Sequence, residues 1–288
     1  MNRAAAFLYI LVLSLSLFIF REAAVAEEID IVNRPINTNG LTGLLFTTSP
    51  YTLSTGTVEI GSGALYESSV VPDYSVTEFP VLIAVGVGKN MEIGLRGSYY
   101  SLKEGSTSTA VNVRSTGDIQ LSYKWNFLPQ AEDSKAPGVA LIVTGIFPVE
   151  HDLNKKIDSV LHWGLRIGLC AGTEFNYWKD HIMGIYADIQ AAGQDLTEER
   201  LQDVYGIFNT GLLLPISKYD NLQILTEYTV VYGRNKLSLT GGDYSALTFG
   251  IRLVSERFNL TMGSQYLYKY VEGFDNSSRV IGLMSMKF

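Results

Sequence analysis

The chain has 288 residues, a formal net charge of −7 and a single cysteine, Cys170. An acidic chain without a basic stripe argues against nucleic acid as a partner, and one cysteine excludes an internal disulfide framework. Tyrosine, glycine and phenylalanine are abundant, at 17, 27 and 13 residues, and only 18 % of the residues are charged. This composition is strand-rich and allows either one large closed sheet or two small domains.

Residues 1–26 have the organisation of a cleaved signal peptide. Asn2 and Arg3 form a short basic region, residues 4–20 carry no charge, and Ala24-Val25-Ala26 is a small-x-small cleavage site. The alternative is an N-terminal membrane anchor, for which the uncharged run is almost long enough. We expect an exported protein whose mature chain starts at Glu27.

Residues 27–56 do not alternate between polar and apolar side chains. Residues 35–40 have the composition of a loop, and residues 41–46 form a short apolar patch. Two interpretations stay open for this part of the chain. It is either a periplasmic segment packed beneath the domain that follows, or a partial plug that enters that domain.

Residues 57–288 contain segments of roughly ten residues in which apolar and polar side chains alternate. Lys89-Asn90 is a two-residue connection between two such segments, which predicts a hairpin. We expect residues 103–116 to form a Ser/Thr-rich loop and residues 191–202 to be able to form a short helix. The twelve predicted strands cover 57–68, 77–88, 91–102, 117–128, 138–148, 159–175, 181–190, 203–214, 222–232, 244–254, 258–269 and 278–288.

These strands predict an all-β fold, a single antiparallel transmembrane β-barrel of about 12 strands. The strand length suits a tilted crossing of a bilayer, the strand number is even, and short and long connections alternate. Closure would remove sheet edges, which lipid cannot satisfy. A soluble sandwich is the alternative, but it would bury its large apolar side chains and expose its charges. We therefore expect localisation in the outer membrane, with both termini in the periplasm.

The charged side chains in the middle of the strands share one parity with glycine, serine and threonine, so all of them can face the lumen together. They either pair with one another and fill the interior, or they line a pathway for solutes. The candidate lumen-lining residues are Glu59, Glu92, Arg96, Asp118, Lys124, Arg166, Glu174, Asp188, Glu227 and Arg252.

The last strand, Ser278 to Phe288, places Gly282, Met284, Met286 and Phe288 on one face. A chain that ends in a strand with a terminal phenylalanine is typical of outer-membrane barrels, whose closing strand is read by the barrel assembly machinery. We expect these four residues to be the assembly signal. The two methionines stand where aromatic residues are common.

The other expected contacts of the barrel are outer-membrane lipid and lipopolysaccharide.

Catalytic chemistry has weak support. The three histidines are His151, His162 and His181, and none is followed by a serine two residues later, as a phospholipase-type barrel would require. His151-Asp152 is the nearest approach to a protease couple, and ordinary loop polarity explains it more simply. One cysteine and scattered histidines give no metal-ligand spacing. We expect no enzyme activity, no cofactor and no metal.

Two stretches carry a family resemblance. Gly117-Asp118-Ile119 with Tyr123-Lys124, followed by residues 138–148 (GVALIVTGIFP), resembles the family called MetA-pathway of phenol degradation, whose members are often described as transporters. The acidic residue expected after Pro148 is displaced to Glu150. Residues 40–61 also resemble a motif of several uncharacterised outer-membrane proteins.

This resemblance implies a porin-like channel or transporter for small solutes, including hydrophobic or aromatic ones. The alternatives are a lipid- or surface-modifying enzyme of the outer membrane and a structural or adhesion barrel.

Overall fold

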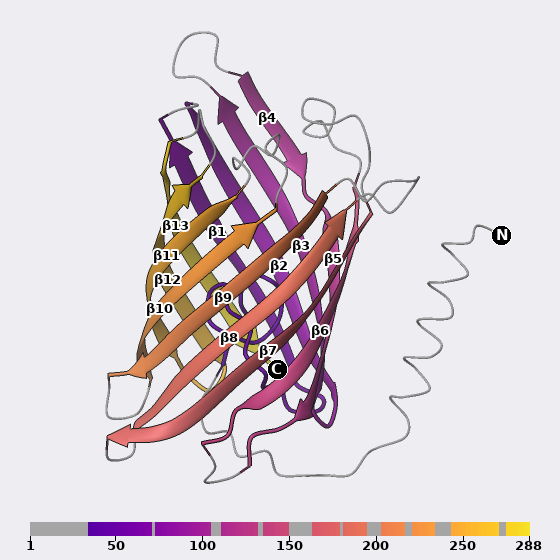
Figure 1. Ribbon diagram of the computed structural model, residues 1–288, viewed down its shortest axis with the longest axis vertical. Helices are drawn as coiled ribbons and strands as arrows, with labels where there is room; N and C mark the ends of the chain where they lie inside the picture. Colours follow the sequence, from indigo (N-terminus) through magenta and orange to yellow (C-terminus); the bar gives the residue numbers. More distant parts are fainter. Residues whose placement is uncertain are drawn as a thin grey trace, which may run out of the picture.

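A computed structural model describes residues 34–70, 73–104, 111–131, 135–149, 163–178, 181–194, 203–216, 221–233, 243–270 and 275–288. The expected signal peptide, residues 1–26, lies outside these ranges. The described chain is a barrel of long, tilted strands (Figure 1). Its strands are β1 (Val58–Ser69), β2 (Tyr74–Gly88), β3 (Met91–Glu104), β4 (Val111–Thr116), β5 (Ile119–Leu128), β6 (Gly138–Phe147), β7 (Gly164–Trp178), β8 (His181–Gln194), β9 (Asp203–Pro215), β10 (Leu222–Tyr232), β11 (Tyr244–Val254), β12 (Phe258–Lys269) and β13 (Ser277–Lys287).

The sheet is antiparallel throughout and closes on itself. β1 pairs with β2 on one side and with β13 on the other, and β2 also pairs with β3. β4 and β5 both pair with β3, β4 opposite Tyr99–Glu104 and β5 opposite Met91–Arg96. They are therefore two pieces of one strand, interrupted at Gly117-Asp118, and the wall consists of twelve strands. Closure pairs the twelve-stranded wall on both sides, as a lipid environment requires, except that β4 pairs with β3 alone among the described strands.

The prediction of twelve alternating strands is confirmed. The hairpin at Lys89-Asn90 is also present, and Asn90 adopts a positive φ of 63° there, as this tight turn requires. The prediction of a loop over 103–116 is wrong in part, because β3 continues to Glu104 and β4 occupies the end of that range. Serine and threonine suit strands as well as loops, so composition misled the prediction. Of the proposed helix at 191–202, residues 191–194 belong to β8 and residues 195–202 lie outside the described ranges.

The outer surface of the barrel is apolar. Along β11 and β12, large side chains stay more than half exposed, with Phe249 and Ile251 at 56 % and Met262 at 59 %. Arg252, the residue after Ile251, points the other way and is buried. Exposed apolar side chains and buried charges are the arrangement of a protein whose outer solvent is lipid. Among the described residues, no helix is long and apolar enough to cross a membrane.

Residues 34–57, called the N-terminal segment below, lie inside the barrel (Figure 1). The segment folds into tight turns with two isolated bridges, Ile36 with Thr42 and Gly43 with Thr48. Several of its apolar side chains, including Leu44 and Leu45, belong to the main buried cluster together with residues of the wall. The barrel interior is thus a packed core around this segment.

Candidate functional site in the barrel lumen

The ten candidate lumen-lining residues all lie on the inward face, buried or partly buried. Seven of them contact the N-terminal segment: Glu59, Glu92, Lys124, Glu174, Asp188, Glu227 and Arg252. Sequence parity predicted their direction but not this partner. The lumen charges are therefore compensated largely by the backbone of one segment.

Glu227 on β10 binds three consecutive amides of the segment. Its carboxylate accepts hydrogen bonds from the backbone N–H of Leu45, Phe46 and Thr47 at 2.8, 2.9 and 2.6 Å. Asp188 on β8 accepts the next amide, that of Thr48, at 2.8 Å. Charge-assisted hydrogen bonds of this kind are the strong ones. Two carboxylates therefore fix the tip of the segment against one side of the wall.

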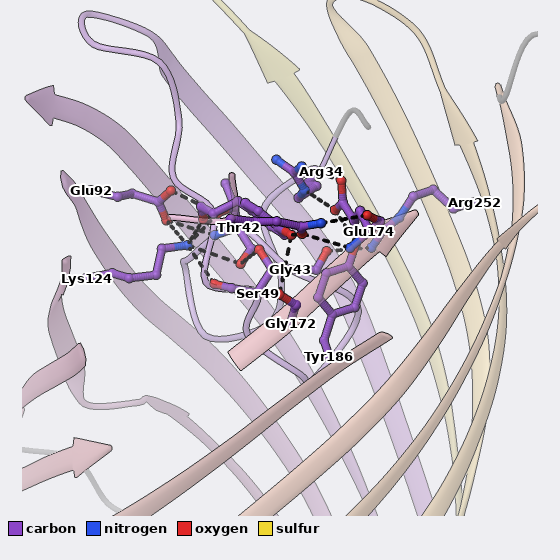
Figure 2. Close-up of polar contacts among 12 residues, drawn as sticks. Arg34, Thr42, Gly43, Ser49, Glu92, Lys124, Gly172, Glu174, Tyr186 and Arg252 are labelled. Carbon is purple, nitrogen blue, oxygen red and sulfur yellow. Dashed lines mark hydrogen bonds and ion pairs between the residues drawn. The ribbon is translucent and has the colours of Figure 1, made fainter. Parts of the chain in front are cut away.

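Glu92 and Lys124 fix the opposite side of the segment (Figure 2). Glu92 accepts from the backbone N–H of Thr42 at 2.8 Å and of Leu53 at 2.9 Å. Lys124 donates to the carbonyl oxygen of Tyr51 at 2.5 Å and to the hydroxyl of Thr42 at 2.5 Å, and it lies 3.4 Å from Glu92. Both side chains are fully buried, so their charges need these partners.

The start of the described segment is held by Arg34 (Figure 2). Its guanidinium donates to both carboxylate oxygens of Glu174, at 2.5 and 2.6 Å, and lies 3.8 Å from the ring centre of Tyr51. Burial alone would lower the pKa of Arg34, but the negative charge of Glu174 outweighs it and raises the pKa above its usual value. Burial raises the pKa of Tyr51 as well. Arg34 is therefore a permanent cation and Tyr51 a neutral phenol.

Two further wall residues bind the segment near the seam between β1 and β13. Arg252 donates to the carbonyl oxygen of Gly43 at 3.1 Å. Glu59 accepts from the backbone N–H of Ile36 at 3.1 Å and also from the hydroxyl of Ser285 on β13. One carboxylate thus joins the segment to both strands that close the barrel.

Glycines in the wall let the segment approach closely. A Cβ atom at Gly94 would lie 2.2 Å from the carbonyl oxygen of Gly40, and one at Gly211 would lie 2.3 Å from a methyl group of Leu44. Cβ atoms at Gly86 on β2 and Gly263 on β12 would also be close to the segment, at 2.2 Å from the carbonyl oxygen of Ser54 and 2.6 Å from a methyl group of Leu45. Ala140 and Ile142 on β6 share a buried cluster with Leu41. With the charged contacts, the segment is packed against wall residues around the whole barrel.

The other three candidates are Arg96, Asp118 and Arg166, and we observe no polar contact between them and the N-terminal segment. Arg96 pairs with Glu78 on the neighbouring strand β2. Arg166 donates to the side-chain oxygen of Gln120 at 2.8 Å. Asp118 is partly buried at the break between β4 and β5. These residues lie further toward the end of the barrel at which β6, β8 and β10 end and β7, β9 and β11 begin. This end is called the long-loop end below, because the connections there, 148–163, 195–202 and 233–243, are the long ones in the sequence.

A second cluster of polar and charged side chains, centred on Glu67, lies near the long-loop end, and the sequence analysis did not include it among the candidate lumen-lining residues. Glu67 accepts from Arg279 at 2.7 Å, from the hydroxyl of Tyr74 at 2.7 Å and from the hydroxyl of Ser277 at 2.9 Å. Lys269 donates to the same phenol oxygen of Tyr74 at 2.6 Å. Glu67 has the parity of Glu59 on β1, so the signal that found Glu59 could have found it too. This network bridges β1, β2, β12 and β13.

The proposed assembly-signal residues lie on the outer face of β13 or at its end. Met284 and Met286 are exposed, and Phe288 is 70 % exposed. Gly282 is partly buried. Phe288 exchanges two backbone hydrogen bonds with Val58, at 2.8 and 3.2 Å. The chain terminus is therefore part of the barrel seam, while the assembly role stays a prediction.

The catalytic candidates are not described. His151, Asp152 and His162 fall outside the described ranges, and the side chain of His181 is likewise not described. Among the described residues, no group of three or more His, Cys, Asp or Glu side chains could hold a metal ion.

No protein-family model matches the chain, and no curated protein matches it. Among solved structures it is similar to the COG4313 outer membrane channel from Pseudomonas putida F1, with 9 % identity, a TM-score of 0.60 and coverage of 83 % of this chain and 98 % of that one. It is similar to LpxR from Salmonella typhimurium, with 9 % identity, a TM-score of 0.51 and coverage of 80 % and 99 %.

The KdgM porin in complex with disordered oligogalacturonate matches with 7 % identity, a TM-score of 0.50 and coverage of 80 % and 99 %. At such low identity the shared property is the fold. The chain has the twelve-stranded fold of outer-membrane β-barrels, and its apolar exterior is that of a barrel in the outer membrane.

Proposed function

We propose that this protein is an outer-membrane channel for small solutes, in which the N-terminal segment is a plug that must move before a solute can pass. The observation that carries the proposal is the lumen itself. Its wall carries charged side chains on the inner face beside a buried apolar cluster, and the segment that fills it is held by wall side chains. A polar lumen around a removable filling suits a gated pathway.

The plug can leave without opening the wall. The bonds of Glu227, Asp188, Glu92 and Arg252 to the segment run between wall side chains and segment backbone. The ladder hydrogen bonds that hold the barrel together run between neighbouring wall strands. Solvent could replace the side-chain partners one by one while the twelve-stranded sheet stays intact.

The nature of the solute rests on resemblances. Residues 117–119 with 123–124, and residues 138–148, resemble the family called MetA-pathway of phenol degradation. This resemblance favours hydrophobic or aromatic solutes. Two structures with the same fold are named as a channel and as a porin in complex with oligogalacturonate. We propose small solutes as partners. Outer-membrane lipid and lipopolysaccharide around the apolar exterior, and the barrel assembly machinery at the terminal strand, complete the expected contacts. The proposal assigns no catalytic activity.

The test is flux through the purified mature chain, starting at Glu27, in liposomes and in planar bilayers. We expect swelling rates that fall with solute size, and single-channel events that become more frequent when contacts to the segment are weakened. A folded barrel that passes no solute of any class, even after Glu227→Ala loosens the segment, would contradict the proposal.

A further inference from the structure

We propose that Arg166, with Arg96 and Gln120, binds the carboxylate of a small anionic solute in the lumen. This inference rests on the proposed channel function and names the charge of the solute. It concerns the lumen on the long-loop side of the N-terminal segment. The three residues come from β7, β3 and β5 and are neighbours through the ladder, since Arg96 pairs with Gln120 in register and Arg166 with Thr144 on the intervening strand β6.

Arg166 is a buried cation whose partners do not neutralise it. Only 9 % of the residue is exposed, yet the hydrogen bond that we observe from its side chain goes to the neutral oxygen of Gln120 at 2.8 Å. Its Nε is buried and has no hydrogen-bond partner. No carboxylate among the described residues lies within ion-pair distance of it. A buried charge in this state is costly unless an opposite charge joins it.

The neighbouring charges increase this demand. Arg96 also has a buried Nε without a partner, and it lies opposite Gln120, the residue whose side chain binds Arg166. Glu78 compensates Arg96. Asp188 attracts Arg166 electrostatically, but its oxygens already accept from Thr48, Gln190 and Asn209. The pair of guanidinium groups therefore keeps an excess of positive charge.

The donors suit a carboxylate. A guanidinium offers several N–H groups in one plane, a geometry that matches the two oxygens of a carboxylate. Because the oxygen of Gln120 accepts from Arg166, the amide nitrogen of Gln120 remains as a further donor. An arriving carboxylate would find donors from several strands and would compensate the excess positive charge of the two arginines.

The position fits a binding step ahead of the plug. Arg166 lies four residues before Cys170 on β7, about 13 Å along the strand, and the thiol of Cys170 lies 3.4 Å from the carbonyl oxygen of Ser49 in the segment. A Cβ atom at Gly40, in a turn of the segment, would lie 3.6 Å from the Cβ of Arg96. A solute entering from the long-loop end would thus reach the arginines next to the segment.

The experiment uses three sugars of nearly equal size and different charge: glucuronate, glucose and glucosamine. Binding to the detergent-solubilised mature chain is measured by titration calorimetry, and flux by liposome swelling. We expect the wild type to bind glucuronate at least about tenfold more tightly than glucose, and Arg166→Gln to remove most of that preference, since a hydrogen bond to a charged group is worth about one to two powers of ten in affinity. The matched control, Arg257→Gln in the exposed turn before β12, should retain the preference.

The two proposals fail in different ways. Equal binding of the three sugars to the wild type would overturn the carboxylate site, whatever the flux, and would do so even if Arg166→Gln failed to fold. Equal loss of glucuronate binding in both arginine variants would overturn it as well. Arg166-dependent binding without flux of any solute class, in the wild type and in Glu227→Ala, would leave the site standing and remove the channel function.

Discussion

The carboxylate of Glu227 accepts a hydrogen bond from the backbone amide of Thr47 at 2.6 Å, although 180 residues separate the two along the chain. The same side chain also binds the amides of Leu45 and Phe46. In Glu227→Ala, the buried amides of Leu45 and Thr47 lose their partner, at a cost of about 1–3 kcal/mol each, and the partly buried amide of Phe46 loses it as well. We expect the segment to loosen and the swelling rate of liposomes to rise several-fold.

The control for Glu227→Ala is Glu256→Ala, which removes an exposed carboxylate from the turn before β12. It should leave flux unchanged. If Glu227→Ala keeps a folded, heat-modifiable barrel and wild-type flux, Glu227 does not restrain a moving plug.

Ser49 and Cys170 offer a way to lock the segment. The thiol of Cys170 lies 3.4 Å from the backbone oxygen of Ser49, and the chain has no other cysteine. We expect Ser49→Cys to form a disulfide with Cys170 under oxidising conditions, and the oxidised protein to lose flux because the segment can no longer leave. Reductant should restore it, as followed in a bilayer before and after its addition. Full flux through protein shown by mass spectrometry to be cross-linked would mean that solutes pass a stationary segment.

Gly94 and Gly97 on β3 form a matched pair. A Cβ at Gly94 would lie 2.2 Å from the carbonyl oxygen of Gly40, whereas a Cβ at Gly97 would meet no heavy atom within 4 Å. We expect Gly94→Ala to displace the segment and to raise its susceptibility to added protease. Gly97→Ala should behave as the wild type, so equal proteolysis patterns in the two variants would argue against close packing at this point.

Phe249 reports on the outer face. It lies in the middle of β11 and is 56 % exposed. We expect Phe249→Arg to destabilise the barrel in a bilayer by about 2–4 kcal/mol, the cost of a cation near the membrane midplane, as measured by urea unfolding in liposomes. Tyr270→Arg, at an exposed position just after β12, should cost much less, and equal costs at both positions would be inconsistent with a membrane at the height of Phe249.

Phe288 reports on assembly. Its side chain is exposed while its backbone closes the seam against Val58. We expect Phe288→Asp to reduce the amount of folded protein in the outer membrane, and Phe288→Tyr to restore it, in a heat-modifiability gel of membrane fractions. Normal assembly of Phe288→Asp would remove the signal role from this residue.

The strands were readable from the sequence because each one faces lipid on one side and the lumen on the other. Residues such as Ile251 and Arg252 alternate with period two, and this alternation alone predicts a strand and the direction of each side chain. β4 was missed because its short Ser/Thr-containing stretch is only six residues long and is separated from β5 by a break at Gly117-Asp118 rather than by a turn.

The partners of the charges were not readable. Parity places Glu227 and Lys124 in the lumen, but nothing in their own strands shows that backbone amides and carbonyls of residues 42–51 satisfy them. The segment itself has no period, because its tight turns present backbone in many directions. Its two interpretations could be distinguished only by the contacts of a folded structure.

The contacts of Glu59 couple the seating of the N-terminal segment to the stability of the seam. This carboxylate on the first strand binds the amide of Ile36 and the hydroxyl of Ser285 on the last strand. A barrel whose segment has left keeps the contact between the two strands but leaves the buried carboxylate with one donor fewer. The seam of the emptied barrel is therefore weaker than that of the filled one, and closing the sheet and filling it stabilise each other.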